Sequence, residues 1–203
     1  MTETKKTNRL TVKDIITVLI LTILIVVFSF FMSSLTMFNH ILNLVFTVGI
    51  ILFIIAPVFL VMVHRVNKGG VMAIFMGIIA VIYIIMGYWY VGLLTVLAAI
   101  PCEIIMAKPD SYKRPWKNTV LFAIFGLSLL STNFLPVWWF WEAFEKTALS
   151  GGMSAGYIQA YRDFYTNPPI VAGIIAFSLL ASVMGCRAGY GLLNGYFKKA
   201  GLI

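Results

Sequence analysis

Residues 15–35 read IITVLILTILIVVFSFFMSSL and contain no charged side chain. A helix rises about 1.5 Å per residue, so this stretch of about 20 residues is long enough to cross the roughly 30 Å hydrocarbon core of a bilayer. It is longer than the apolar core of a typical signal peptide and lacks a small-x-small cleavage site. We therefore interpret it as a retained first membrane span that follows the basic segment from Lys5 to Lys13.

Five further apolar runs follow the first one. They are Ile41–Val63, Val71–Met86, Tyr88–Met106, Thr119–Trp141 and Pro169–Leu193. These runs are continuous, which favours helices over the alternating strands of a barrel, and lipid offers no partner to unpaired backbone groups. The sequence predicts an all-α membrane protein with six transmembrane helices, folded as a single domain over residues 1–203.

The composition supports a membrane setting. Hydrophobic residues make up 61% of the chain, charged residues only 11%, and the mean hydropathy is +0.98. A soluble domain carries about a quarter charged residues, so a soluble enzyme, a disordered tail and a secreted disulfide scaffold are excluded. In a soluble protein the net charge of +8 would suggest nucleic acid, but basic residues at the ends of spans explain it better, and we expect no nucleic-acid partner. Cys102 and Cys186 lie inside apolar runs, which is typical of buried thiols.

The basic residues predict the topology. Threading six spans puts one group on the same side of the membrane: Lys5, Lys6, Arg9, Lys13, Arg65, Lys68, Lys108, Lys113, Arg114, Lys117, Lys198 and Lys199. The opposite side receives only Lys146 and Arg162. The positive-inside rule then predicts a multi-pass protein of the bacterial cell membrane with both termini in the cytoplasm.

The long external connection from Glu142 to Pro168 contains a predicted amphipathic helix between spans five and six. Ser154 can cap it, and Asn167-Pro168-Pro169 ends it. Its apolar face would carry Tyr157, Ile158, Tyr161, Phe164 and Tyr165. The helix either lies on the membrane surface or folds over the bundle as a lid, with Gly151-Gly152 as a hinge.

Aromatic and polar residues gather at the external end, where we predict a substrate-binding site. The candidates are Asn39, His40, Tyr88, Trp89, Asn133, Trp138, Trp139, Trp141, Tyr161, Arg162 and Tyr165. An aromatic concavity with a few polar groups is typical of small-molecule sites, although Trp and Tyr also form interfacial belts. His40 is either a hydrogen-bonded turn residue or a metal ligand that donates an axial nitrogen to haem or a related macrocycle. Arg162 pairs either with a substrate carboxylate or with Asp163 or Glu142.

The sequence lacks several common catalytic motifs. HExxH and a Walker lysine loop are absent, and paired carboxylates within spans are absent too, so we expect no enzyme and no intrinsic cofactor. Glu103 and Arg187, near the cytoplasmic ends of spans, fit snorkelling or pairing better than a proton relay. Gly185 and Gly189 in the last span either pack against another helix of this chain or dock a partner subunit.

Several short segments carry a family resemblance. They are Leu10–Ile16 (LTVKDII), Met86–Tyr90 (MGYWY), Leu135–Phe140 (LPVWWF), Gly152–Ser154 (GMS) and Asn194–Leu202 (NGYFKKAGL). With about 200 residues and six spans, the chain resembles the Trep_Strep family of bacterial integral membrane proteins, which is similar to the S components of energy-coupling factor (ECF) transporters.

The resemblance implies partners and a mode of action. An S component captures a micronutrient outside and topples in the lipid bilayer to release it inward, with a membrane T component and two cytosolic ATPases as partners. Many S components dock the T component through a small-x-x-x-small motif in the first helix. Residues 17–23 (TVLILTI) depart from that motif, which leaves Thr17, Gly185 and Gly189 as docking candidates.

We therefore expect an S component for a vitamin-like compound. Haem or another tetrapyrrole is the leading specific ligand, and a flat vitamin without metal fits the aromatic residues equally well. The alternatives are a membrane enzyme and a structural or assembly protein whose aromatic end is only an interfacial belt.

Overall fold

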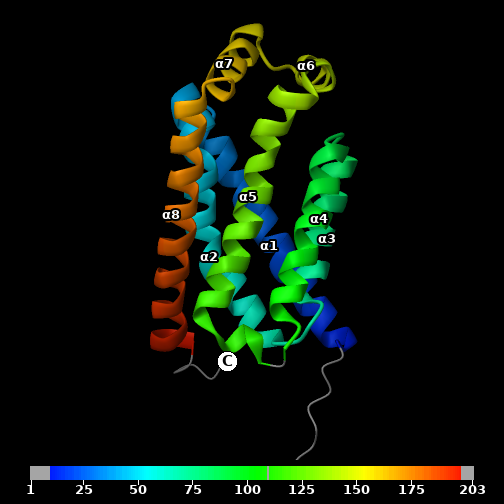
Figure 1. Ribbon diagram of the computed structural model, residues 1–203, viewed down its shortest axis with the longest axis vertical. Helices are drawn as coiled ribbons and strands as arrows, with labels where there is room; N and C mark the ends of the chain where they lie inside the picture. Colours follow the sequence, from blue (N-terminus) through cyan, green and yellow to red (C-terminus); the bar gives the residue numbers. More distant parts are fainter. Residues whose placement is uncertain (1–9, 109, 198–203) are drawn as a thin grey trace, which may run out of the picture.

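The computed structural model describes residues 10–108 and 110–197, and these form only helices and connections (Figure 1). The helices are α1 (Val12–Thr36), α2 (Thr47–Val66), α3 (Val71–Ile85), α4 (Trp89–Met106), α5 (Pro115–Trp139), α6 (Trp141–Ser150), α7 (Ala155–Tyr165) and α8 (Pro168–Leu192). Three short helical segments complete the fold: the π-helical segments η1 (Leu42–Phe46) and η3 (Leu193–Phe197), and the 3-10 helix η2 (Ser111–Lys113). The prediction of an all-helical protein is confirmed.

Five segments are long and apolar enough to cross a membrane. Within the described part of the chain they are Val12–Thr36, Leu42–Val66, Trp89–Met106, Pro115–Trp139 and Pro168–Gly195. The remaining predicted span forms α3, which has 15 residues and is therefore about 22 Å long, short of the roughly 30 Å hydrocarbon core. The multi-pass prediction thus holds for five of the six helices by length and composition.

The up-and-down course of the chain creates two distinct ends (Figure 1). The start of α1, the α2–α3 turn, the α4–α5 connection and the end of α8 lie at one end, which we call the basic end. Seven of the predicted cytoplasmic cations fall there: Lys13, Arg65, Lys68, Lys108, Lys113, Arg114 and Lys117. The other five, Lys5, Lys6, Arg9, Lys198 and Lys199, lie outside the described residues. That the basic end faces the cytoplasm stays a prediction.

Helix α2 is central and α1 is peripheral. Twelve of the 20 residues of α2 are buried, and Phe59 packs on Phe75 and Phe122 with ring centroids 5.7 and 4.8 Å apart. Only four of the 25 residues of α1 are buried. The outward side chains of α1 are apolar along most of its length, as expected of a helix that faces lipid.

Two glycines of α8, Gly185 and Gly189, pack against α2 of the same chain. A Cβ atom on Gly185 would lie 2.8 Å from the Phe53 carbonyl oxygen, and one on Gly189 would lie 2.7 Å from Leu60 Cδ1. Small residues allow this close approach in lipid, where tight packing drives helix association. The structure therefore favours the intramolecular alternative and removes both glycines from the candidate docking surface. Thr17, the third docking candidate, is half-buried, and its hydroxyl donates to the Lys13 carbonyl at 2.8 Å.

Glu103 caps helix α3 from the neighbouring helix α4. Its two carboxylate oxygens accept hydrogen bonds from the backbone N–H groups of Gly70 (2.8 Å) and Ala73 (2.9 Å). Gly70 is the N-cap residue that precedes α3. Its φ is 91°, and it has no side chain that could cap the helix. The carboxylate thus satisfies donors at a helix N-terminus, where negative charge is favoured. Glu103 is thus paired with backbone N–H groups, in agreement with the expectation that it pairs.

We expect Glu103→Ala to lower the free energy of unfolding by about 2 to 3 kcal/mol, because two N–H groups lose a charged acceptor. Glu103→Gln keeps one acceptor oxygen and should lose about half as much. Thermal or SDS-induced unfolding of the purified protein measures both values. Glu142→Gln, on the exposed side of α6, is the control; an equal loss in that variant would contradict the capping role.

Candidate functional site

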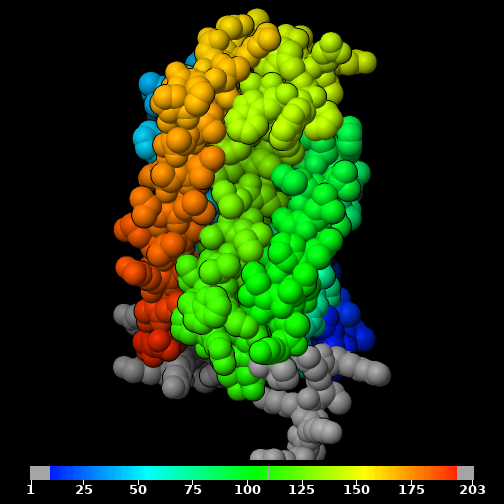
Figure 2. All heavy atoms as spheres, in the orientation of Figure 1, coloured from blue at the N-terminus to red at the C-terminus, as the bar shows by residue number. Residues whose placement is uncertain are grey.

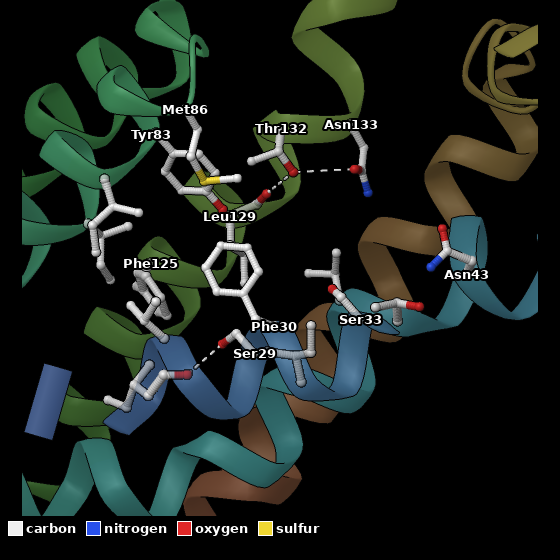
Figure 3. Close-up of a pocket in the computed structure, with 17 residues that line it drawn as sticks. Ser29, Phe30, Ser33, Asn43, Tyr83, Met86, Phe125, Leu129, Thr132 and Asn133 are labelled. Atoms are coloured by element: carbon white, nitrogen blue, oxygen red, sulfur yellow. Dashed lines mark hydrogen bonds between the residues drawn. The ribbon is translucent and has the colours of Figure 1, made fainter. Parts of the chain in front are cut away.

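A cavity of about 180 Å³ lies between α1, α2, α3 and α5, towards the end opposite the basic end (Figure 3). We call it the inner chamber. Its wall consists of Ile25, Val26, Ser29, Phe30, Ser33, Asn43, Thr47, Val48, Ile51, Ile79, Ile82, Tyr83, Met86, Phe125, Leu129, Thr132 and Asn133. The wall is mostly apolar with a few hydroxyl and amide groups, which is the usual make-up of a small-molecule site.

A second cavity of about 200 Å³ adjoins the first one beneath α7. We call it the roof chamber. It is lined by Tyr83, Tyr88, Thr132, Asn133, Phe144, Met153, Tyr157 and Tyr161. Tyr83, Thr132 and Asn133 line both chambers, so these three residues form the junction between them. Together the chambers offer room at the small end of the range of about 300 to 1,000 Å³ that ligand sites occupy.

The junction carries hydrogen-bonding groups. The Thr132 hydroxyl donates to the Leu129 carbonyl at 2.7 Å and to Asn133 Oδ1 at 3.2 Å. No described residue accepts a hydrogen bond from Asn133 Nδ2, and the amides of Asn133 and Asn43 lie on the same side of the chamber (Figure 3). Asn133 therefore has a free donor for a ligand in the cavity.

Helix α7 forms the roof and is tied to the bundle by its tyrosines. The Tyr157 hydroxyl donates to Asn43 Oδ1 at 2.6 Å. The Tyr161 hydroxyl donates to the carbonyls of Thr132 (3.2 Å) and Asn133 (3.0 Å), and the Tyr165 hydroxyl donates to the Leu44 carbonyl. The predicted amphipathic helix is confirmed, with the Ser154 hydroxyl capping the Tyr157 N–H at 3.3 Å. Its aromatic face turns inward over the chambers, as the lid alternative requires.

Three of the predicted site residues line the roof chamber, namely Tyr88, Asn133 and Tyr161. Tyr165, the last residue of α7, is buried, and its carbonyl accepts the Trp138 indole N–H at 3.0 Å. Trp89 and Trp139 are 52% and 69% exposed, as expected of an interfacial belt. Trp138, Trp139 and Trp141 border a separate surface groove of about 410 Å³ at the α5–α6 corner.

Three polar candidates, Asn39, His40 and Arg162, do not line either chamber. Asn39 Oδ1 accepts from the Leu42 N–H at 3.0 Å and so caps the turn before α2. His40 is exposed. Its ring and that of Tyr157 form a T-shaped pair with their centroids 5.3 Å apart. The structure thus places no imidazole where a macrocycle inside the chambers would need an axial ligand. The Arg162 guanidinium lies 4.9 Å from the centre of the Trp141 ring and makes no described ion pair with Asp163 or Glu142.

Most wall residues were not among the predicted site residues, including the polar residues Asn43, Tyr83, Thr132 and Tyr157. Asn43, Tyr83 and Thr132 fall inside predicted spans, where a polar side chain indicates a face that points into the bundle.

Helix α6 was not predicted from the sequence either. Span five ends at Trp139, because Phe140 leaves the helical conformation at φ −133° while its N–H still bonds the Leu135 and Pro136 carbonyls. Trp141, which was expected to close that span, therefore begins α6.

The roof tyrosines predict how stability depends on pH. Burial, and then the neighbouring Tyr88, raises the pKa of Tyr157 to about 12; burial also raises the pKa values of Tyr161 and Tyr165. An unfolded chain ionises its tyrosines near pH 10, so above that pH the folded state binds more protons. Stability contributed by the neutral tyrosines is then lost as pH rises.

We expect the free energy of unfolding to fall between about pH 10 and 12 as the unfolded chain ionises its tyrosines. Tyr157→Phe should make that fall shallower, and at pH 7 it should cost about 1 kcal/mol through the lost hydrogen bond to Asn43. Unfolding of both proteins at each pH measures the two slopes. Identical slopes would contradict the contribution assigned to Tyr157.

The chain has a family match that spans almost its whole length. A family model described as hypothetical bacterial integral membrane protein (Trep_Strep) matches residues 12–199. No curated protein and no solved structure matches the chain.

Proposed function

The chain belongs to the Trep_Strep family of bacterial integral membrane proteins, and from that membership we propose that it is the substrate-binding S component of an ECF importer. The observation that carries this proposal is the pair of adjoining chambers under α7, at the end of the bundle opposite the basic end. If the basic end faces the cytoplasm, the chambers lie near the outer surface, where an S component captures its substrate.

The chamber walls support binding rather than catalysis. Both are built from apolar, aromatic, hydroxyl and amide side chains, and a carboxylate or imidazole on the wall would be needed for most acid–base chemistry. A free donor on Asn133 and a roof of tyrosines suit recognition of a ring compound by stacking and one or two hydrogen bonds. These features favour a binding subunit over a membrane enzyme.

The transport partners follow from the proposed role. The chain would supply the binding site, a membrane T component would couple it, and two cytosolic ATPases would provide the energy. With Gly185 and Gly189 packed against α2, the T component docks on another face of the bundle.

Of the two ligand classes that the sequence suggests, the chambers support a compact vitamin-like ring compound better than haem. His40 does not line them, and the cavities, at about 180 and 200 Å³, lie at the small end for ligand sites. Haem would also bring two carboxylates into an uncharged wall, which is costly without partners.

Co-purification tests the transporter role. The tagged protein, isolated in mild detergent from its own bacterium, should bring with it one further membrane subunit and two ATPases that carry Walker motifs. A vitamin panel should reveal a compound that stabilises the folded state, by about 2.7 kcal/mol at a concentration of 100 Kd. Isolation without ATPases would contradict the ECF role, and a panel without any stabilising compound would favour a structural or assembly protein.

A further inference from the structure

The tip of the α3–α4 hairpin is apolar and lies below the roof. Residues 84–89 read IIMGYW, and Ile85 is 79% exposed. Helix α3 is only about 22 Å long and so falls short of a full hydrocarbon core, whereas α4 is long and apolar enough to cross one. Figure 1 shows the hairpin ending short of the level that α6 and α7 reach. The tip carries no charge, as expected of a hairpin that ends within or at the edge of the bilayer.

Two residues mark an opening of the inner chamber on this side. Phe30 of α1 and Met86 at the end of α3 both line the chamber, and they are 48% and 41% exposed. Side chains that are part of the wall and also exposed lie at a mouth. The neighbouring outward residues of α1, Val27 and Phe31, are exposed and apolar, so this mouth opens on a lipid-facing surface.

The aqueous end of the chambers lies beneath α7. Helix α7 is held over the chambers by the hydrogen bonds of Tyr157 and Tyr161 described above. Figure 2 shows the side chains of α6 and α7 covering that end of the bundle. Entry from the aqueous end passes beneath α7, which these bonds hold in place, whereas the exposed wall residues at the side mouth, Phe30 and Met86, have apolar side chains.

The lining also restricts the charge of the occupant. None of the residues that line either chamber is Asp, Glu, Lys, Arg or His. A buried charge without a partner is costly, whereas a neutral amide or carbonyl group can bond Asn133 Nδ2. From the walls and the mouth together, we infer that the ligand is an uncharged, largely apolar ring compound that enters sideways from the bilayer between α1 and the α3–α4 hairpin. This inference rests on the proposed function in taking the chambers as the binding site.

Thiol labelling in lipid nanodiscs tests the route without knowledge of the ligand. Thr132→Cys puts a reporter of similar size at the junction of the chambers, and Leu129→Cys serves if that variant does not fold. The reagents are butyl methanethiosulfonate, which is neutral, and its trimethylammonioethyl analogue, which is cationic. Wild-type protein, whose Cys102 and Cys186 are buried, gives the background, and Ser150→Cys on exposed α6 gives the reference rate.

The labelling rate of the Thr132→Cys variant, divided by that of Ser150→Cys, should be at least tenfold higher for the neutral reagent than for the cationic one. In the Thr132→Cys background, Met86→Trp should slow the neutral reagent at least tenfold by filling the side mouth. Met153→Trp, which fills the roof chamber from its aqueous side, is the matched control and should change the rate less than twofold.

Three results would overturn the inference: similar normalised rates for both reagents, no labelling of either reporter, or slowing by Met153→Trp but not by Met86→Trp. The last of these would assign entry to the aqueous end. The labelling requires neither the T component nor the ATPases, so its failure is distinguishable from failure of the ECF role in co-purification.

Discussion

Gly185→Leu is expected to prevent the bundle from folding. A Cβ atom at this position would already lie 2.8 Å from the Phe53 carbonyl oxygen and 2.9 Å from Phe53 Cα, so the contact involves backbone that cannot move aside. Even Gly185→Ala should cost about 1 to 3 kcal/mol, the usual range for overpacking. A leucine adds three more carbons and would force α8 away from α2, the helix with the most buried residues.

The matched control for this prediction lies on the same helix. A Cβ atom on Gly173 would meet nothing within 4 Å, and the residue is exposed. Gly173→Leu should therefore be produced and unfold like the wild type. The yield of monodisperse protein after detergent extraction, with unfolding curves for the alanine variants, measures the difference. Equal yields for the two leucine variants would show that α2 and α8 do not meet at Gly185.

The contact between α8 and α2 was only partly predictable from the sequence. Gly185 and Gly189 at four-residue spacing predict a close helix contact, and the structure has one. The same pattern suits a helix of the same chain and a helix of another protein, because both contacts require only the absence of side chains. Hydropathy, by contrast, located α3 and its short length: the predicted run is Val71–Met86, and the helix ends one residue earlier, at Ile85.

The candidate site was predictable in position but only partly in composition. The concentration of aromatic and polar residues correctly indicated the end at which the chambers lie, and the 3.6-residue periodicity of 154–165 identified the roof helix. However, a tryptophan belt and a binding wall have the same composition, so Trp89 and Trp139 could not be separated from Tyr88 and Tyr161. Which side of each helix faces inward depends on packing between distant segments.

The walls of the chambers are therefore made largely by residues inside the spans. Tyr83 is an isolated polar group in an apolar run, Thr132 lies in the polar stretch Ser131–Asn133, and both line the junction of the two chambers. A polar group in a membrane helix is costly when it faces lipid, and this cost directs it into the bundle. Polar positions within spans would have been a better guide to the site than the ends of the spans.

Asn133→Leu is expected to weaken ligand binding at least tenfold, which corresponds to about 1.4 kcal/mol or more. Leucine has a similar size but no N–H donor, so a ligand acceptor at the chamber junction would be buried without a partner. The fold should tolerate the change, because the described contacts of the Asn133 side chain consist of one hydrogen bond, 3.2 Å from the Thr132 hydroxyl. Titration of thermal stability with the compound that the vitamin panel identifies gives the two dissociation constants.

His40→Ala is the matched control at the same end of the molecule. The imidazole is exposed and lies outside both chambers, so its removal should change the dissociation constant less than twofold. The reverse outcome, with binding lost in His40→Ala and kept in Asn133→Leu, would move the site to the loop before α2 and restore metal-macrocycle ligation by His40. The His40 and Asn133 side chains both lie near α7. A general loss of order at this end of the bundle would therefore weaken binding equally in both variants. A difference between the variants therefore reports which of the two groups meets the ligand.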